Sequence, residues 1–411
     1  MHSFAGVSQT TTPRALEGLK VLDLSRILAG PSATQMLGDL GADVVKVERP
    51  GQGDDTRGWG PPFHSPEGGQ PVAGYFLAAN RSKRSIAIDF STDEGAALIV
   101  RLAERADVFV ENLKPFDLDR RSLGYATLRM NNPGLVYCSI SGFGRTGPRA
   151  REPGYDFLAQ AAAGLMSLTG EPDGAPVKLG VGISDLYTGM HAAIGILAAL
   201  RYRDRTGDGQ HIDLSLYDST LAMLSNVAVD HFLTGEAPKR LGNAHPHIVP
   251  YGVFSASDGH LVIAVGNDAQ FARFAALLDR PELAHDARFS ANASRVQHRD
   301  ALNALLAPLL VASPIEHWLQ RLRAARIPTS KVESVPEAFA DPVAQAREMK
   351  ITSGEHTLLG NPLKLSATPA DTSRAPPALD ADRDEVLRDW LGLDARGCDE
   401  LVARGAFGER R

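Results

Sequence analysis

The sequence predicts an α/β protein with an open parallel sheet in a large domain and a smaller α+β domain. Three observations lead to this prediction. Strand-like apolar segments alternate with helical segments through the first half of the chain, as in parallel sheets joined by crossover helices. Near Ala222 the alternation gives way to a hairpin pattern. The chain also has 411 residues, more than one hydrophobic core usually holds.

The first elements form a strand–helix–strand unit. Leu19–Leu24 is almost continuously apolar, which predicts a buried strand. A helix is expected from Pro31 to about Leu40, because proline is compatible with a first helical turn and Gly41 can end the helix. Asp43–Glu48 is the next strand. Such a unit implies a right-handed crossover between parallel strands.

The rest of the first half continues this alternation, and the predicted large domain is therefore Rossmann-like. We expect strands at Ser85–Asp89, Val108–Glu111, Val136–Ser139 and Gln210–Tyr217, and helices at Glu94–Arg105 and Gly189–Asp204. A long loop, Gly51–Gly74, separates two of the strands, and long loops in compact domains are usually functional or mobile.

The second half has a different organisation. A hairpin is predicted from Tyr251–Ser255 and His260–Val265 around the turn Asp258-Gly259. The further expected elements are helices at Asp268–Leu278, Arg299–Ala307, Ile315–Ala325 and Val335–Glu348, strand-like pieces at Ile351–Thr357 and Leu363–Ala367, a linker at Thr368–Ala378, and acidic helices at the end.

Composition excludes several classes of protein. The net charge is −6, which argues against a broad surface for nucleic acids or anionic membranes. Two cysteines make no disulfide framework, so a reducing compartment is expected. The N-terminus lacks a secretory pattern, and the most apolar segment, near Met190–Leu200, is too short to span a bilayer. A cytoplasmic location without membrane partners is expected.

The sequence also lacks the usual cofactor motifs. The first strand is followed by SRILAGPSA, without the GxGxxG fingerprint of dinucleotide-binding folds. His245 and His247 lie two residues apart, and the other histidines are scattered. No histidine pair has helical spacing with a nearby acid, so no metal site is predicted.

A compact basic cluster, Asn80–Ser85, precedes a predicted strand. Such a cluster is either a solvated loop or a site for phosphate groups, and Lys46 and Arg49 add positive charge to it.

Asp185 lies where a glycine-rich turn enters the most apolar helix. It is either an N-terminal helix cap or a carboxylate nucleophile. In the second interpretation the glycines permit close approach of a ligand, and the helix N-terminus keeps the carboxylate ionised and offers N–H donors to an oxyanion.

Several motifs together resemble the class III CoA-transferases, also called the CaiB/BaiF family, over nearly the whole chain. The opening block LEGLKVLDLSRILAGPSATQMLGDLGADVVKVERPGQGDD carries the resemblance most specifically. The other matching segments are Asn80–Ser85, Val110–Asn112, Ser139–Gly144, Gly154–Asp156 and Asp185–Gly189, the last of which matches the catalytic aspartate of the family.

The resemblance implies a fold and a set of partners. The subunits of an interlocked homodimer are ring-like, with a large domain formed by residues 1–221 and 331–411 and a small domain, 222–330, between them. No cofactor is tightly bound, because coenzyme A enters as the acyl-CoA substrate and the second substrate is a free carboxylic acid. The implied CoA contacts are Ile27, Leu28, Ala29, Arg49, Lys83, Arg84, Asn112, Leu113 and Arg120.

The implied mechanism is nucleophilic catalysis by Asp185. Its carboxylate attacks the acyl-CoA thioester to form an anhydride, and the CoA thiolate then forms an aspartyl-CoA thioester. The acceptor carboxylate displaces this thioester and finally receives the CoA.

Two alternatives remain. Related α-methylacyl-CoA racemases resemble one another in a Gly-His-Asp motif, and this chain has Tyr155 where the base histidine stands. Tyrosine is a poor base at neutral pH, which favours the transferase. A non-catalytic CoA-binding protein is the other alternative, and the intact Asp185 argues against it.

Within the family, the chain most resembles the succinyl-CoA:glutarate (dicarboxylate) branch, through Gly53–Phe63 and Ala244–Tyr251. The second carboxylate of such an acceptor needs a cation, for which Arg57 and Arg240 are candidates. Tyr155 and His247 are further candidates for contact with the substrate.

Overall fold

The computed structural model describes residues 13–65 and 70–408. The N-terminal stretch, for which the sequence predicts no secretory signal, lies outside these residues. The chain forms two compact units. The first comprises Met1–Leu165, Leu179–Ala228 and Pro342–Arg411, and the second comprises Met166–Lys178 and Val229–Asp341. Whether they fold as separate domains with the predicted limits stays a prediction.

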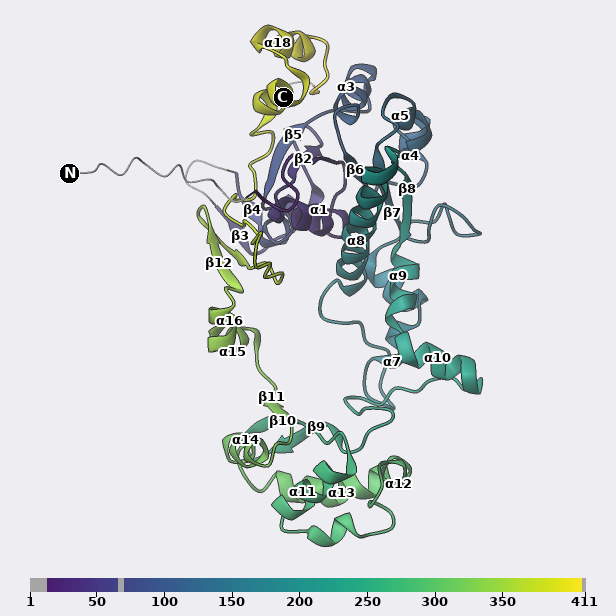
Figure 1. The fold of residues 1–411 in the computed structure, drawn as a ribbon, viewed down its shortest axis with the longest axis vertical. Helices are drawn as coiled ribbons and strands as arrows, with labels where there is room; N and C mark the ends of the chain where they lie inside the picture. Colours follow the sequence, from purple (N-terminus) through teal and green to yellow (C-terminus); the bar gives the residue numbers. More distant parts are fainter. Residues whose placement is uncertain (1–12, 66–69, 409–411) are drawn as a thin grey trace, which may run out of the picture. The chain divides into compact units, whose positions relative to one another are not determined.

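The first unit is built on a six-stranded sheet in the order β5-β2-β1-β6-β7-β8 (Figure 1). Every neighbouring pair is parallel, which confirms the predicted α/β fold. The strands are β1 (Lys20–Asp23), β2 (Asp43–Glu48), β5 (Lys83–Ala87), β6 (Val108–Glu111), β7 (Val136–Ser141) and β8 (His211–Ser215).

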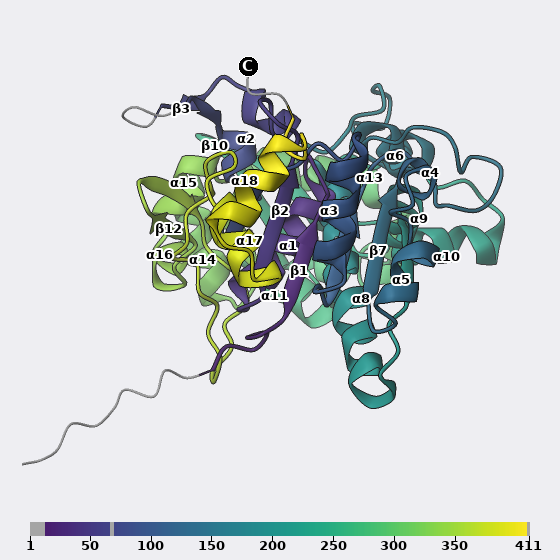
Figure 2. The same cartoon turned by 90° about the horizontal axis from the view of Figure 1, so that it is seen from above.

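Helices cover both faces of this sheet. On one face, α1 (Ala29–Asp39) and α8 (Ile183–Thr206) bury their apolar side chains with residues such as Val44 and Val110. The opposite face packs against α3 (Asp93–Ala103), α5 (Tyr125–Asn131) and the C-terminal α17 (Arg383–Leu391) and α18 (Ala395–Ala403) (Figure 2). Burial on both faces explains why the strands are nearly continuous apolar runs.

The first unit contains shorter elements as well. These are η1 (Asp55–Gly58), β3 (Phe63–His64), β4 (Val72–Ala73), α2 (Gly74–Leu77), α4 (Asp117–Arg120), α6 (Asp156–Ala162), α9 (Leu216–Met223), α16 (Pro342–Ala346), β12 (Lys350–Ser353) and β13 (His356–Leu359). Two helices, α7 (Leu165–Leu168) and α10 (Ser225–Thr234), extend across the limits of the units.

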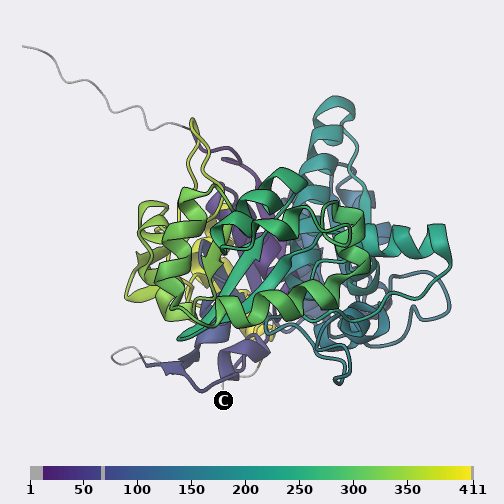
Figure 3. The same cartoon turned by 90° about the horizontal axis from the view of Figure 1, so that it is seen from below.

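The second unit has an antiparallel sheet in the order β11-β10-β9, formed by Thr329–Lys331, Gly259–Ala264 and Tyr251–Ala256 (green in Figure 3). This arrangement confirms the predicted hairpin. Its helical elements are α11 (Asp268–Leu277), η2 (Pro281–Ala284), α12 (Asn292–Gln297), α13 (Arg299–Leu310), α14 (Ile315–Ala324) and α15 (Val335–Ala340). The core contains the fully buried Arg295, whose guanidinium donates to the carbonyl oxygens of Val249 and Phe289 and to Asp268.

Two sequence predictions were wrong in detail. The expected helix Val335–Glu348 is two short helices, because the backbone of Asp341, which precedes Pro342, is extended. Leu363–Ala367 forms no strand. The predicted linker, Thr368–Ala378, has no helix or strand, and it contacts the start of β5, where the Arg374 side chain donates to the carbonyl oxygen of Lys83 at 3.1 Å.

Helix α8 is also longer than expected. It has 24 residues, so its length and apolar composition alone would allow it to cross a bilayer. Its buried side chains, including Ala192 and Ile196, belong to the core between α1 and the sheet. We therefore interpret α8 as the core helix of the α/β unit.

Candidate active site

Asp185 lies in the first turn of α8, close to the start of α1. The contact between the two helices depends on glycines. A Cβ atom on Gly189 would lie 2.7 Å from the carbonyl oxygen of Ala29, and one on Gly182 would lie 3.1 Å from Leu28 Cδ2. These glycines bring the nucleophile candidate to the loop that follows β1.

The helix cap is Asp156 and not Asp185. The N-cap position of α8 is Gly182, which has no side chain to accept a bond. Instead, Asp156 Oδ1 accepts the backbone N–H of Ser184 at 2.7 Å and of Asp185 at 3.3 Å. The capping interpretation of Asp185 is therefore wrong, and these two N–H groups are occupied by a carboxylate.

The electrostatic environment of Asp185 differs from the expected one. Burial and, to a smaller extent, the negative charge of Asp156 raise the pKa of Asp185 to about 7. Among the described residues, no basic side chain offsets these effects. The sequence pattern suggested that the helix N-terminus would keep the carboxylate ionised, but Asp156 receives the donors that would have done so.

Tyr75 and Trp59 are neighbours that the sequence did not single out. Burial raises the pKa of Tyr75, and Asp185, Asp156 and Asp54 raise it further through their negative charges. The rings of Tyr75 and Trp59 meet edge to face, with centroids 5.3 Å apart. Both side chains remain partly exposed, and Tyr75, on α2, lies within electrostatic range of Asp185.

The carboxyl ends of β1 and β6 bring together five predicted CoA contacts: Ile27, Leu28, Ala29, Asn112 and Leu113. The Asn112 side chain holds the loop after β1, since its Oδ1 accepts the Arg26 amide at 2.8 Å and its Nδ2 donates to the Arg26 carbonyl at 2.7 Å. In the strand order, β1 lies between the half that begins with β2 and the half that begins with β6. Open α/β sheets bind ligands at such a switch point.

Ile27 has a left-handed backbone, with φ of 70°. Its amide donates to the carboxylate of Asp54, at 3.3 Å from Oδ1 and 3.2 Å from Oδ2. Lys46 fixes Asp54 in turn through a buried ion pair of 2.8 Å, which holds the pKa of Asp54 at about 2. A non-glycine residue in this conformation is strained, and such strain persists where the surrounding structure holds it.

Arg49 and Arg120 are exposed cations. Arg49 follows β2 and donates to the side-chain oxygen of Gln52 at 3.0 Å. Arg120 lies on α4 and forms an ion pair with Asp117. Both guanidinium groups are open to solvent, as phosphate-binding groups must be before the ligand arrives.

Lys83 has a different setting. It is fully buried, and its ammonium donates to Asp23 at 3.2 Å, to the Pro31 carbonyl at 2.9 Å and to Asn80 at 2.9 Å. These three partners use all its donors. The strand begins two residues earlier than predicted, at Lys83, which places this side chain inside the unit.

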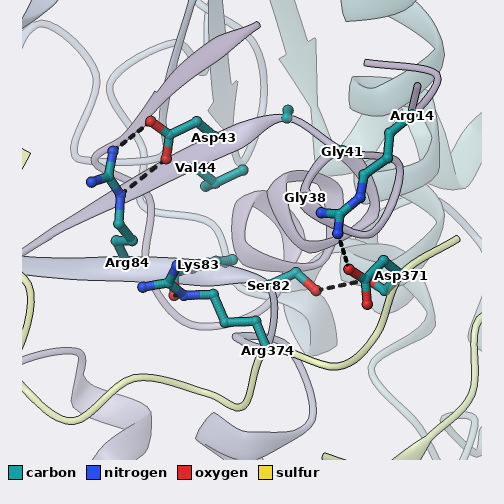
Figure 4. A pocket seen from close by; sticks show the side chains of 11 residues that line it. Arg14, Gly38, Gly41, Asp43, Val44, Ser82, Lys83, Arg84, Asp371 and Arg374 are labelled. Carbon is teal, nitrogen blue, oxygen red and sulfur yellow. Dashed lines mark hydrogen bonds and ion pairs between the residues drawn. The ribbon is translucent and has the colours of Figure 1, made fainter. Parts of the chain in front are cut away.

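Arg84 lies at the other edge of the sheet. It lines a pocket of about 220 Å³ at the amino ends of β2 and β5, with Arg14 and Arg374 (Figure 4). Arg84 pairs with Asp43 and Asp389, Arg14 with Asp371, and Arg374 with Asp382. These carboxylates neutralise the pocket, so its geometry does not favour an anionic ligand.

The predicted acceptor-binding residues fall in both units. In the first unit, Arg57 forms two bonds to buried Glu48, at 2.7 and 2.6 Å, and Tyr155 is exposed at the start of α6. In the second unit, Arg240 donates to the carbonyls of Glu171 and Gly174, and His247 Nε2 lies 2.8 Å from Asp230.

Known proteins share this fold and these segments. Residues 16–383 match CoA-transferase family III. A succinate–glutarate CoA-transferase of Agrobacterium fabrum is 44% identical over 378 residues, which cover 90% of this chain and 94% of that protein. An acetyl-CoA:oxalate CoA-transferase of Acetobacter aceti is 43% identical over 351 residues, which cover 85% and 89%.

A solved structure agrees with both. The crystal structure of a CaiB/BaiF family protein from Brucella suis is 46% identical, with a TM-score of 0.83, and the alignment covers 91% of this chain and 100% of that chain. These similarities extend over the sheet, the segment around Asp185 and most of the second unit. The resemblance noted in the sequence is confirmed, and the chain belongs to CoA-transferase family III.

Proposed function

We propose that this CoA-transferase moves CoA from an acyl-CoA, succinyl-CoA, to a dicarboxylate such as glutarate, with Asp185 as the nucleophile. One observation carries the assignment of Asp185. It is the carboxylate that the packing of α8 on α1 brings next to the loop at the sheet's switch point. No described side chain forms a hydrogen bond or ion pair with its carboxylate.

The chemistry requires no cofactor. The Asp185 carboxylate attacks the thioester carbonyl and expels CoA thiolate, which leaves an acyl-aspartyl anhydride. The thiolate attacks the aspartyl carbonyl, releases the first acid and forms an aspartyl-CoA thioester. The acceptor carboxylate displaces the thiolate to form a second anhydride, whose acceptor carbonyl the thiolate then attacks. This last step restores the Asp185 carboxylate and gives the new acyl-CoA.

Substitution of Asp185 tests this mechanism. Asp185→Ala removes the carboxyl group on which the two anhydrides and the thioester form, so turnover should fall by at least about a thousandfold while the fold persists. During turnover of the unchanged enzyme with succinyl-CoA, hydroxylamine should trap the acylated peptide that contains Asp185. The measurement is peptide mass spectrometry together with the transfer rate.

A matched control is Asp208→Ala, which removes an exposed carboxylate just after the same helix. It should retain full turnover. Trapping of hydroxylamine on a peptide without Asp185, or near-normal turnover of Asp185→Ala, would contradict the mechanism.

We also propose which cations contact the ligands. Arg49 and Arg120 are the candidates for the CoA phosphates, because both are exposed, whereas Lys83 acts from inside the unit by holding Asp23 and Pro31. For the far carboxylate of the acceptor, Arg240 is favoured over Arg57. Glu48 neutralises Arg57, whereas the hydrogen-bond partners of Arg240 among the described residues are neutral carbonyls.

The choice of acceptor can be measured with a panel of free acids. We expect succinyl-CoA to transfer CoA to glutarate roughly tenfold or more faster, in kcat/KM, than to valerate. The reason is that a cation of the acceptor site without its carboxylate loses a charge-assisted hydrogen bond of about 1.5–3 kcal/mol. Oxalate belongs in the panel because a relative named for oxalate is nearly as similar as the one named for glutarate.

Arg240→Gln should reduce the ratio of kcat/KM for glutarate to kcat/KM for valerate. Arg273→Gln is the matched control, since Arg273 is another carbonyl-bonded arginine of the second unit. Equal rates for mono- and dicarboxylates in the unchanged enzyme would contradict the preference for a dicarboxylate acceptor. They would not contradict the CoA-transferase activity.

We further propose that two chains form an interlocked homodimer. Helix α8 supports this, because Leu186, Met190, Ile194 and Leu197 form an exposed apolar stripe along it. Such a stripe on a folded unit marks an interaction surface. A cytoplasmic location is also proposed, and it is supported by two cysteines, Cys138 and Cys398, which are both free.

A further inference from the structure

Two histidines that are distant in the sequence meet in the first unit. His64 lies on β3, and His356 begins β13, with Glu355 before it in the turn of the β12–β13 hairpin. The His64 and His356 rings stand edge to face with centroids 4.5 Å apart. One ligand atom from each of the three residues lies within 4.8 Å of the others.

Each imidazole of this cluster has a buried nitrogen that forms no hydrogen bond to a described residue. Among the described residues, His64 Nε2 and His356 Nδ1 are buried and have no hydrogen-bond partner. A buried polar atom without a hydrogen-bond partner destabilises the folded protein, so two such atoms at one place need an explanation. The His356 residue is only 9% exposed.

The hairpin fixes Glu355 beside His356. Ser353 pairs with His356, so Gly354 and Glu355 form a two-residue turn, and Gly354 adopts the positive φ of 59° that such turns require at their first position. The Glu355 side chain remains 54% exposed, which keeps the cluster open to solvent on one side. His64 Nε2 lies 3.4 Å from Glu355 Oε1.

We propose that His64, Glu355 and His356 bind a divalent first-row transition-metal ion, for which Zn²⁺ is the reference. Two imidazoles and a carboxylate are ligands that zinc prefers, at about 2.0–2.2 Å each. Two ligand atoms on a tetrahedral ion at these distances stand about 3.4 Å apart, which matches the separation of His64 Nε2 from Glu355 Oε1. A small closure brings the third ligand into range.

The bound ion would join two segments that already touch through the two imidazole rings and through the contact of His64 with Glu355. It links the β3–β4 ribbon (Phe63–His64 and Val72–Ala73) to the β12–β13 hairpin, both in the first unit. The site does not involve Asp185, so it stands independently of the proposed reaction.

The test measures zinc binding to the full chain after treatment with a chelator. Titration with ZnCl₂ against a chromophoric chelator should give one tight ion per chain, and zinc should raise the melting temperature. The double variant His64→Gln/His356→Gln should lose that ion. Glu355→Gln, at an exposed position that does not threaten folding, should weaken the affinity by roughly tenfold or more.

Substitution with Co²⁺ adds a readout of geometry, because a four-coordinate site gives intense visible absorption that the double variant should lack. His285→Gln, an exposed histidine of the second unit, is the control and should bind zinc as the unchanged chain does. Equal zinc stoichiometry and affinity in the unchanged chain and the double variant would overturn the proposal, as would the absence of any bound ion.

Discussion

Two neighbouring carboxylates in the candidate site have opposite environments. Asp156 accepts the N–H groups of Ser184 and Asp185 and the side-chain amide of Gln160. The Asp185 carboxylate accepts no hydrogen bond from a described residue, and both burial and the charge of Asp156 disfavour its ionised form. The Asp156 carboxylate is therefore satisfied by hydrogen-bond donors, whereas the carboxylate of the proposed nucleophile, Asp185, is left available for a substrate.

This arrangement predicts a pH dependence. The pKa of Asp185 is raised to about 7, and only the carboxylate form is a nucleophile. The rate should therefore rise with pH as Asp185 ionises and level off above about pH 8. Asp156→Asn removes a negative charge while keeping an oxygen for the helix N–H groups, so the rise should move to lower pH.

The measurement is kcat/KM for transfer from succinyl-CoA between pH 5 and 9. Burial is the larger cause of the raised pKa, so the shift in Asp156→Asn should be partial. The lost bond from Gln160 costs about 1 kcal/mol of stability, which a thermal melt can check. A profile that is identical in both proteins would contradict the coupling of the two carboxylates.

The basic cluster is the part of the site that the sequence described least well. Charged residues in a run are usually solvated, yet Arg81, Lys83 and Arg84 are all buried with acidic partners from other elements, namely Asp39, Asp23 and Asp43. Buried charges require such partners. The acidic partners lie around 40 to 60 residues away in the sequence, so no local pattern predicts which acidic side chain pairs with which basic one.

At the scale of elements, the contact between α1 and α8 positions Asp185. Gly189→Ala should disrupt it, because the new Cβ atom would lie 2.3 Å from Ser32 Oγ and 2.7 Å from the Ala29 carbonyl oxygen. The serine can rotate, but the carbonyl belongs to the backbone. The overpacking costs about 1–3 kcal/mol and outweighs the gain of up to about 1 kcal/mol in helix propensity.

Gly189→Ala should have a lower melting temperature than the unchanged protein. Its transfer rate should fall by more than its stability does, because α8 moves away from α1. Gly195→Ala is the control on the same helix, where the Cβ atom would make an ordinary contact of 3.4 Å with Ile212. That variant should be at least as stable as the unchanged protein. If Gly189→Ala were equally stable and active, the close approach would not be needed.

Elements with a strong local pattern were predicted well. Asp43–Glu48 and Val108–Glu111 are strands with the expected limits, because both are apolar runs bounded by turns. Helix α8 was predicted to begin at Gly189 and begins at Ile183, since its first turn is capped by Asp156 from a distant helix. The sequence analysis did not single out His64 and His356, because they meet only where the β3–β4 ribbon contacts the β12–β13 hairpin.

At the scale of the whole molecule, the C-terminal segment completes the first unit. Val386, Leu387 and Trp390 of α17 lie in the same core as Leu22 and Ile86 of the N-terminal strands. The chain thus leaves the first unit, forms most of the second, and returns. A subunit connected in this way keeps one core across both ends of its sequence, which agrees with a large domain built from two parts.

The apolar stripe on α8 predicts that the chain is a dimer in solution. Ile194 is 61% exposed on a helix whose other face is buried. Together with the exposed Met190 and Leu197 it forms an apolar surface that is unfavourable in water. Size-exclusion chromatography with light scattering should give twice the chain mass of 43.9 kDa.

Ile194→Glu places a charge in the interface and should shift the mass toward the monomer or lower the melting temperature of the dimer. Met130→Glu alters a side chain that is more exposed, at 72%, and should leave both quantities unchanged. A monomeric mass for the unchanged protein would contradict the dimer outright, and a dimer indifferent to Ile194→Glu would place the interface elsewhere.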